Sequence, residues 1–159
     1  MRYQVRQKLF TIGDQFNIKD ELGNDVFTVK RQIMSVGKKL RIYDMAQNEL
    51  CYIEQKLFKF MPEYQIFLQG ELSATVKKKF AFLKNDFTII GNDVNYYVDG
   101  NAWGHEFRIK KDVVQVAAIS KKYISLRDTY TVDIDDSENQ VALIAMTIVI
   151  DMVLHDRRS

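Results

Sequence analysis

The sequence VALIAMTIVIDMVL, residues 141–154, decides the fold. A surface helix has an apolar stripe and a polar back, whereas this stretch is apolar on all sides for about three helical turns. Its β-branched residues would also suit a strand, but its length and its alanine, methionine and leucine content favour a helix. Ser137-Glu138-Asn139-Gln140 has the form of a capping box, so we expect a helix over residues 137–155.

A helix that is apolar all round must be covered on every side. One flat sheet covers a single face of the helix. Leaving the opposite face exposed to water loses about 25 cal/mol of stabilising free energy for each apolar Å² that could have been buried. A sheet of roughly 12 strands curled into a barrel has a radius on the order of 12 Å, which accommodates a helix of about 5 Å radius with its side chains. A helix in a dimer interface and a membrane-buried tail are the competing interpretations.

Most of the chain before residue 137 alternates apolar and polar residues, as strands with one wet face do. Leu40–Tyr43 and Phe107–Lys110 are two such segments. Short clusters of Gly, Asn and Asp interrupt the alternation and predict hairpin turns. We expect about 10 to 12 strands before residue 136, a pattern typical of a sandwich or a barrel.

A weak internal repeat supports this interpretation. The pattern Phe16-x-Ile18-x-Asp20-x-x-Gly23-Asn24 returns as Leu40-x-Ile42-x-Asp44-x-x-Gln47-Asn48, and each copy predicts a strand, a turn and a strand. Looser copies run over residues 64–76 and 96–110, the second turning through Asp99-Gly100-Asn101. Such hairpins cannot bury their apolar faces alone, so they should join into one antiparallel sheet.

The expected fold class is therefore α+β: a closed antiparallel β-barrel of about 12 strands wrapped around a hydrophobic C-terminal helix. A single proline and the lack of a Ser/Gly-rich linker argue against a domain boundary. We expect one domain over residues 1–159, with the strands in 1–136 and the central helix in 137–155.

Composition narrows the function classes. The chain has 23 Lys and Arg against 21 Asp and Glu, a net charge of +2, which gives no strong field for a nucleic-acid partner. Cys51 is the only cysteine and there are two histidines, so we expect no disulfide, metal site or cofactor. The N-terminus lacks the apolar run of a signal peptide, and no apolar run reaches the roughly 20 residues that span a bilayer. The expected location is the cytoplasm.

The apolar C-terminal helix with its embedded Asp151, followed by His155-Asp156, and the hairpin repeats resemble the LURP-one-related family. The resemblance covers essentially the whole chain. It implies the fold of tubby C-terminal domains and phospholipid scramblases, a closed 12-stranded barrel around a hydrophobic C-terminal helix. Tubby domains bind phosphoinositide head groups, and scramblases are linked to lipid movement and calcium. No motif here matches the tubby head-group site, so none of its residues is carried over.

Lysine clusters are the first candidate sites. The densest is Lys77-Lys78-Lys79, and Lys38, Lys39 and Arg41 form another, with pairs at residues 110–111 and 121–122. Converging at one barrel edge, they would hold an anionic lipid head group at about 1 kcal/mol per cation. The alternative is solvation and edge protection of strand ends. Trp103, beside a predicted turn, is a candidate exposed binding aromatic, or else a cap on the edge of the core.

Carboxylates supply two further candidates. Asp133, Asp135, Asp136 and Glu138 occupy the region where scramblase relatives have a proposed calcium-binding stretch, but helix capping explains them and we expect no bound metal. Asp151 and the histidine at 155 are four residues apart and share a helix face, as a base and its orienter would. The structural interpretation places both near the barrel mouth.

A small barrel filled by its own helix leaves no central cavity for a substrate, so we expect no enzymatic activity. The leading hypothesis is a binding domain for anionic phospholipid head groups at a membrane surface. A module for protein–protein interaction or scaffolding is the alternative. An enzyme that uses Asp151 and His155 is the third.

Overall fold

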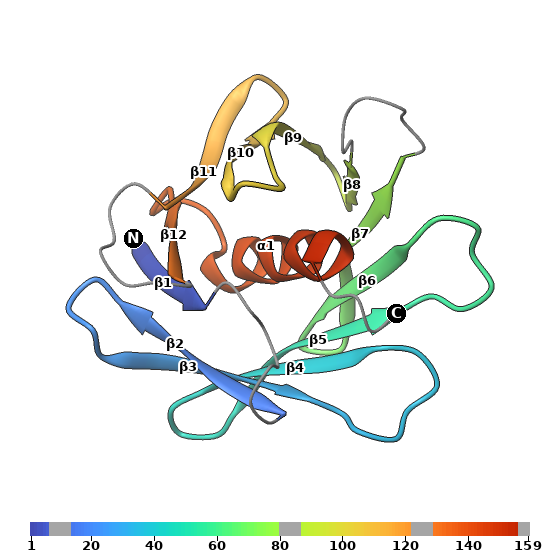
Figure 1. The fold of residues 1–159 in the computed structure, drawn as a ribbon, viewed down its shortest axis with the longest axis horizontal. Helices are drawn as coiled ribbons and strands as arrows, with labels where there is room; N and C mark the ends of the chain where they lie inside the picture. Colours follow the sequence, from blue (N-terminus) through green and yellow to red (C-terminus); the bar gives the residue numbers. More distant parts are fainter. Residues whose placement is uncertain (7–13, 80–86, 122–128, 156–159) are drawn as a thin grey trace.

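The computed structural model describes residues 1–6, 14–79, 87–121 and 129–155 (Figure 1). Lys122 and Asp156 lie outside these residues. In the described part of the chain, twelve antiparallel strands close into a barrel around one helix, as expected. The strands are β1 (Arg2–Arg6), β2 (Gln15–Asp20), β3 (Asp25–Arg31), β4 (Lys39–Asp44), β5 (Glu49–Gln55), β6 (Glu63–Leu68), β7 (Glu71–Lys78), β8 (Phe87–Gly91), β9 (Asn95–Asn101), β10 (Glu106–Lys111), β11 (Val114–Ser120) and β12 (Thr129–Ile134).

Each strand pairs with its neighbours in sequence, and β1 closes the barrel by pairing with β12. The seam holds Arg2 opposite Asp133, where the guanidinium donates to the carboxylate at 2.9 Å. Closure leaves no edge strand among the twelve, so every strand has two partners for its backbone groups.

The barrel has two different ends because the strands alternate in direction. At the turn end, residues 21–24, 45–48, 69–70 and 112–113 make short turns, and helix α1 (Gln140–His155) begins. At the loop end lie the longer connections 32–38 and 56–62 and the turn 102–105, and α1 ends. Figure 1 shows loops 32–38 and 56–62 extending to the side on which the helix ends.

Helix α1 runs through the middle of the barrel, which confirms the interpretation of residues 141–154 (Figure 1). Leu143, Ile144, Ala145 and Met146 are consecutive and so point to four different sides of the helix, and all four are buried. The inward side chains of the strands, among them Ile18, Ile66 and others, pack against it in one core cluster. The helix therefore replaces the second sheet that an open sheet would need.

The helix begins at Gln140 rather than at Ser137, so the predicted capping box is wrong. Asn139 is the N-cap: its side-chain oxygen accepts from the backbone N–H of Ala142 at 3.0 Å. Ser137 serves a turn instead, because its N–H and hydroxyl both donate to Asp135. Gln140 donates its side-chain amide to the carbonyl of Asp135.

The internal repeat corresponds to two equivalent hairpins, β2–β3 and β4–β5. Both carry a register shift at the same place in the repeat, after Ile18 and after Ile42. In the first turn Asp20 accepts the N–H of Asn24 at 2.9 Å, and in the second Asp44 accepts that of Asn48 at 2.9 Å. The repeat is therefore a repeat of turn chemistry as well as of apolar spacing.

The two turns differ at the position that needs a left-handed backbone. Gly23 has φ +86°, and its counterpart Gln47 has φ +67°, a left-handed conformation that costs a residue with a Cβ about 1 kcal/mol. We expect Gln47→Gly to raise the free energy of unfolding by about 0.5–1 kcal/mol and Tm by about 1–4 °C, measured by thermal and urea denaturation. Gly23→Gln is the matched reverse change and should lower both. A loss of stability in Gln47→Gly would contradict this account.

The turn predicted through Asp99-Gly100-Asn101 is wrong. All three residues belong to β9, and the chain reverses at residues 102–105 instead. Gly100, at φ +112°, still has a backbone reason to be glycine, because a Cβ there would lie 2.8 Å from the carbonyl oxygen of Glu106 on β10. The correction places Trp103 and His105 in the turn itself.

Cys51 lies on β5 with its side chain facing the core, as expected of a wall residue. Burial, and then the charge of Glu49, raise the pKa of its thiol to about 12. The thiolate that reacts or binds metal is therefore disfavoured.

Candidate functional site

Charge and apolar character are distributed unequally between the two ends of the barrel. Acidic side chains gather at the turn end, among them Asp20, Glu21, Asp44, Glu71, Asp112 and Asp136. Lysines gather at the loop end, in a set that we call the basic rim: Lys38, Lys39, Lys56, Lys59, Lys77, Lys78 and Lys79. Although the net charge of the chain is small, the charge is separated along the barrel axis, with an acidic turn end and a basic loop end.

The loops at this end expose large apolar side chains, which we call the apolar tips: Ile33, Met34, Val36, Phe58 and Phe60. Met34 is 98% exposed, Phe58 101% and Phe60 93%. Met34 and Phe58 also adopt left-handed backbone conformations, at φ 59° and 60°. The loops thus present apolar groups to solvent at a backbone cost of about 1 kcal/mol each.

The two loops form one surface. Gly37 in the first loop has φ +77°, and a Cβ there would lie only 2.8 Å from Cδ2 of Leu57 in the second. The backbone N–H of Lys38 donates to the side chain of Gln55, and the N–H of Gln55 donates back to the carbonyl of Lys38. A pocket of about 340 Å³ lies beside them, with Arg31, Gln32, Ile33, Met34, Ser35, Gly37, Lys38 and Gln55 as its walls.

The candidate lysines fall at one end of the barrel. Lys38 precedes β4 and Lys39 begins it, while Lys77 and Lys78 end β7 and Lys79 follows it. Glu63 at the start of β6 lies between the two groups, with its carboxylate 3.7 Å from the ammonium of Lys77. The sequence did not show that these clusters share an end.

Arg41 is placed differently from the lysines. Its Nε lies 2.9 Å from the carboxylate of Glu49, and its guanidinium lies 4.6 Å from the centre of the Tyr52 ring. Its guanidinium also donates to the side chain of Gln32 at 3.1 Å, a residue in the wall of the loop-end pocket. Arg41 therefore lies on the outer wall of β4 and β5, beside the pocket, and is held by these partners.

A second cluster lies inside the loop end, where the last turn of α1 meets the turn 102–105. Nε2 of His105 lies 2.6 Å from Oδ1 of Asp151, and both side chains are almost fully buried. Nε2 of His155 lies 3.8 Å from the same oxygen. The sequence pointed to Asp151 and His155 but not to His105, which is 46 residues away from Asp151 and joins them from another element.

Aromatic rings stack in a column through this cluster. The His105 ring lies 4.6 Å from Tyr130 on one side and 4.6 Å from His155 on the other, nearly parallel to both. Trp103 meets His155 edge-on at 5.4 Å. Trp103 is 52% exposed, so it covers the cluster and faces solvent at the same time, which combines the two interpretations of this residue.

Burial governs the ionisation of the cluster. Burial raises the pKa of Asp151 above its ordinary value, although the hydrogen bond and charge of His105 oppose the shift. Burial lowers the pKa of His155, against the attraction of Asp151. Burial and then the charge of Asp151 hold the pKa of Tyr130 well above its usual range.

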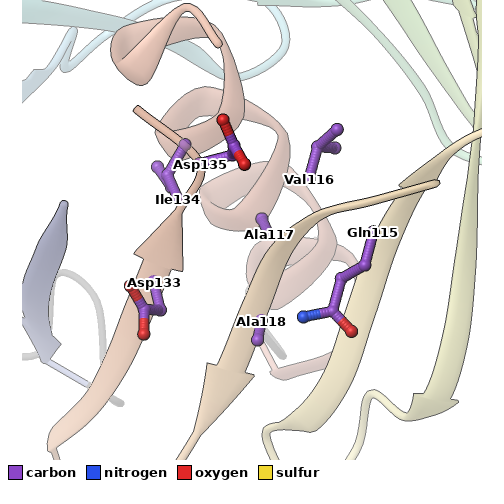
Figure 2. Close-up of a pocket in the computed structure, with 7 residues that line it drawn as sticks. All are labelled: Gln115, Val116, Ala117, Ala118, Asp133, Ile134 and Asp135. Atoms are coloured by element: carbon purple, nitrogen blue, oxygen red, sulfur yellow. The ribbon is translucent and has the colours of Figure 1, made fainter. Parts of the chain in front are cut away.

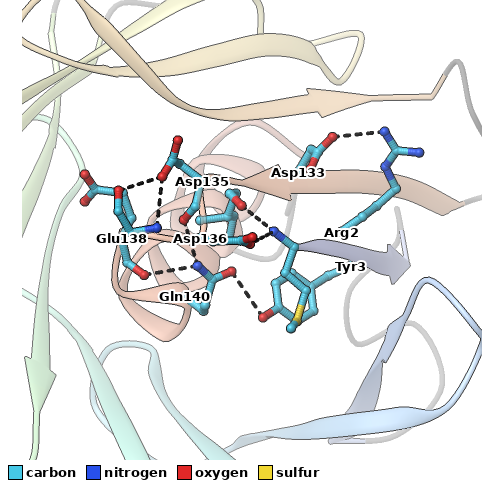
Figure 3. A network of polar contacts seen from close by, with 10 residues as sticks. Arg2, Tyr3, Asp133, Asp135, Asp136, Glu138 and Gln140 are labelled. Atoms are coloured by element: carbon cyan, nitrogen blue, oxygen red, sulfur yellow. Dashed lines mark hydrogen bonds and ion pairs between the residues drawn. The ribbon is translucent and has the colours of Figure 1, made fainter.

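The acidic segment is engaged at the start of the helix (Figure 3). Asp133 pairs with Arg2, and Asp135 accepts from the N–H and hydroxyl of Ser137. Asp136 accepts from the amino group of Met1 at 2.7 Å, and Glu138 lies 3.4 Å from Lys111. These contacts give each carboxylate a role in fixing the seam and the helix start.

A smaller pocket of about 180 Å³ lies between the turn-end parts of β11 and β12 (Figure 2). Its walls are Gln115, Val116, Ala117, Ala118, Asp133, Ile134 and Asp135. Its two carboxylates are those already paired with Arg2 and Ser137. Neither this pocket nor the one at the loop end is lined by the buried histidine and aspartate cluster.

A closed antiparallel barrel threaded by its own C-terminal helix defines the class of this protein. Residues 1–151 match the LURP-one-related family. The chain is 34% identical to the uncharacterized protein YxjI of Bacillus subtilis (strain 168) over 152 residues, which are 96% of this chain and 93% of that protein. The chain therefore belongs to the LURP-one-related family.

Structural comparison agrees. An X-ray structure of a protein from Arabidopsis thaliana superposes with a TM-score of 0.67, covering 99% of this chain and 91% of that one. At 17% sequence identity, the likeness shows a shared fold. In the described part of the chain, no helix has both the length and the apolar content to cross a bilayer.

Proposed function

We propose that this protein is a non-enzymatic binding domain whose loop end docks on anionic phospholipid bilayers. The observation that carries the proposal is the coincidence of the apolar tips and the basic rim at one end of the barrel. Exposed apolar side chains beside a group of lysines suit a surface where hydrocarbon lies below a layer of negative head groups.

The apolar tips supply the first contribution. Burying a fully exposed Met or Phe side chain in an apolar medium yields about 1.5–3 kcal/mol. Met34, Phe58 and Phe60 are almost completely exposed, so insertion recovers nearly the whole of this free energy. Isolated exposed apolar residues are ordinary, but three on adjoining loops form a patch that needs a partner.

The basic rim supplies the second contribution. A lysine near an anionic membrane surface adds about 1 kcal/mol, and clusters of 4–8 cations are typical of such surfaces. The acidic turn end would face away from the membrane, so the polarity of the barrel also sets its orientation. The pocket beside loop 32–38 has Arg31 and Lys38 in its walls and offers a place for a head-group phosphate.

Two alternatives are weaker. A protein partner would use the same apolar tips, but it would also need an acidic face to match the lysines. An anionic bilayer carries the matching negative charge on its own surface. An enzyme that uses Asp151 and His155 would need substrate to reach side chains of which the first is 3% exposed and the second 28%. The barrel interior is filled by α1, which supports the non-enzymatic interpretation.

Sedimentation with vesicles tests the proposal. We expect binding to phosphatidylcholine vesicles that contain about 30% phosphatidylserine, weakening as salt rises, and little binding to phosphatidylcholine alone. Replacing Lys77, Lys78 and Lys79 with Gln removes three charges and should weaken binding by about 3 kcal/mol, roughly 100-fold. Phe58→Ser with Phe60→Ser should weaken the binding that survives at high salt.

The turn end offers matched controls. Lys19, Lys110 and Lys111 are ion-paired with Asp25, Asp99 and Glu138, and their replacement with Gln removes the same net charge. Leu22→Ser, at an 86% exposed turn-end position, matches the phenylalanine changes. Both controls should leave vesicle binding almost unchanged. Indifference to anionic vesicles at low salt would overturn the proposal, and equal losses in control and loop-end variants would refute the docking face.

A further inference from the structure

We infer that His105, Asp151 and His155 form a binding site for one divalent transition-metal ion of the zinc class. One nitrogen from each imidazole and one carboxylate oxygen lie within 4.8 Å of one another. The three residues come from the 102–105 turn and from two successive turns of α1. The inference goes beyond the proposed membrane function and does not depend on it.

The separations are close to those of a coordination sphere. Ligand atoms about 2.0–2.1 Å from a tetrahedral zinc ion lie about 3.3 Å apart. The observed distances from Oδ1 of Asp151 are 2.6 Å to His105 and 3.8 Å to His155, which bracket this value. Shifts of less than 1 Å would bring both distances to this value, and the third separation, between the two imidazole nitrogens, is at most 4.8 Å.

Unpartnered buried atoms point to something that the cluster lacks. Nε2 of His155 and Nδ1 of His105 are both buried without a hydrogen-bond partner. Buried polar atoms normally have one, and two in a single cluster indicate a missing group. Tyr130 is fully buried and stacks on His105, so its hydroxyl belongs to the same cluster.

His155 has one nitrogen available to a metal ion. Nε2 is buried without a hydrogen-bond partner, and the ring also interacts with the backbone of Ala102. Metal-binding histidines typically hold one nitrogen in a hydrogen bond and direct the other at the ion. In a neutral ring whose hydrogen lies on Nδ1, Nε2 turns a lone pair toward the carboxylate of Asp151, an arrangement that a cation between them would stabilise.

The donor set selects the kind of ion. Two imidazoles and one carboxylate suit zinc and neighbouring transition metals, whereas calcium and magnesium prefer oxygen ligands alone. Three protein ligands leave a position for water. The site differs from the acidic segment at the helix start. It also departs from the expectation of no metal, which counted Cys51 and the two histidines but did not foresee that Asp151 joins them.

Binding must disturb the ring column. His105 and His155 are nearly parallel, 16° apart, and parallel rings cannot both direct a lone pair at one ion. His155 is the ring free to tilt, because its side chain is 28% exposed and that of His105 only 1%. Trp103 touches His155 edge-on and is the only tryptophan, so its fluorescence reports the tilt.

The test is titration of the chelator-treated protein, without an affinity tag, with zinc chloride. Calorimetry should show one site per chain, Trp103 emission should change with the same midpoint, and Tm should rise with zinc concentration. His155→Ala removes one ligand at the half-exposed end of the helix and should weaken zinc binding by more than about 100-fold. Asp136→Asn, in the exposed acidic segment, is the control and should bind zinc normally.

A second measurement keeps the test decisive should His155→Ala fail to fold. The chain has only two histidines, so nitrogen NMR of the unaltered protein resolves both rings, and zinc should shift Nε2 of each. No binding, binding of equal affinity in His155→Ala, loss of binding in Asp136→Asn, or unchanged histidine nitrogens would each overturn the inference. The last three outcomes would identify adventitious binding elsewhere on the surface.

Discussion

Ile148→Asp is expected to abolish the cooperative fold at room temperature. Ile148 is fully buried at the middle of α1, where the surrounding barrel leaves no path to solvent. A carboxylate there loses the apolar contribution of isoleucine and also bears the cost of a buried polar group, together at least about 5 kcal/mol. This matches the lower end of the whole stability of a typical domain, about 5–15 kcal/mol. Far-UV circular dichroism and urea denaturation would measure the loss.

The same substitution on the surface gives the control. Val113 is 90% exposed in a turn, so Val113→Asp should change the free energy of unfolding by less than about 0.5 kcal/mol. The milder Ile148→Val should cost about 0.5–1.5 kcal/mol and keep the cooperative transition. A stable, cooperatively folding Ile148→Asp protein would show that the helix is not enclosed by the barrel.

Asp151→Leu is expected to cost about 3–5 kcal/mol, although it replaces a charged residue with an apolar one in the core. The reason is His105, whose buried Nε2 would lose the partner that it has at 2.6 Å. His105→Phe should cost a similar amount, because it leaves the carboxylate of Asp151 buried without that partner. Urea denaturation in the presence of a chelator measures both.

The double variant distinguishes this account from a simple packing defect. With His105→Phe and Asp151→Leu together, neither unpaired group remains, so the double variant should recover at least about 2 kcal/mol relative to the sum of the single losses. Additive losses would mean that the pair does not stabilise the fold through its hydrogen bond. Asp135→Asn, at an exposed carboxylate bonded to Ser137, is a control with an expected loss of about 1 kcal/mol or less.

The architecture was predictable because it follows from patterns within short segments. The all-round apolar character of residues 141–154 required an enclosing sheet, and the alternation of Leu40–Tyr43 and similar segments supplied its strands. The boundaries were less predictable, because several polar residues compete for each terminus. Asn139, rather than Ser137, caps the helix, since Asp135 engages the serine in a turn of its own.

The sites were only partly predictable because they depend on which segments meet. The lysine clusters were visible in the sequence, but their common end follows from strand direction and register. The same register placed Arg41 beside Glu49 on the outer wall. His105 was missed because the turn was expected at residues 99–101, which left no reason to bring this residue to the last turn of α1. The wrong position of the predicted turn is therefore the reason that His105 was not identified as the partner of Asp151.

The seam between β1 and β12 constrains how the chain folds. Its Arg2–Asp133 contact spans 131 residues of sequence, and α1 follows all twelve strands. The apolar inner face of the sheet therefore stays uncovered until α1 has been synthesised. The pairing of β1 with β12 must then form around α1. The other strand pairings join consecutive strands and can form early, so we expect the pairing of β1 with β12 to be the late step. Before it forms, the unfilled sheet is the species most exposed to aggregation or chaperone capture.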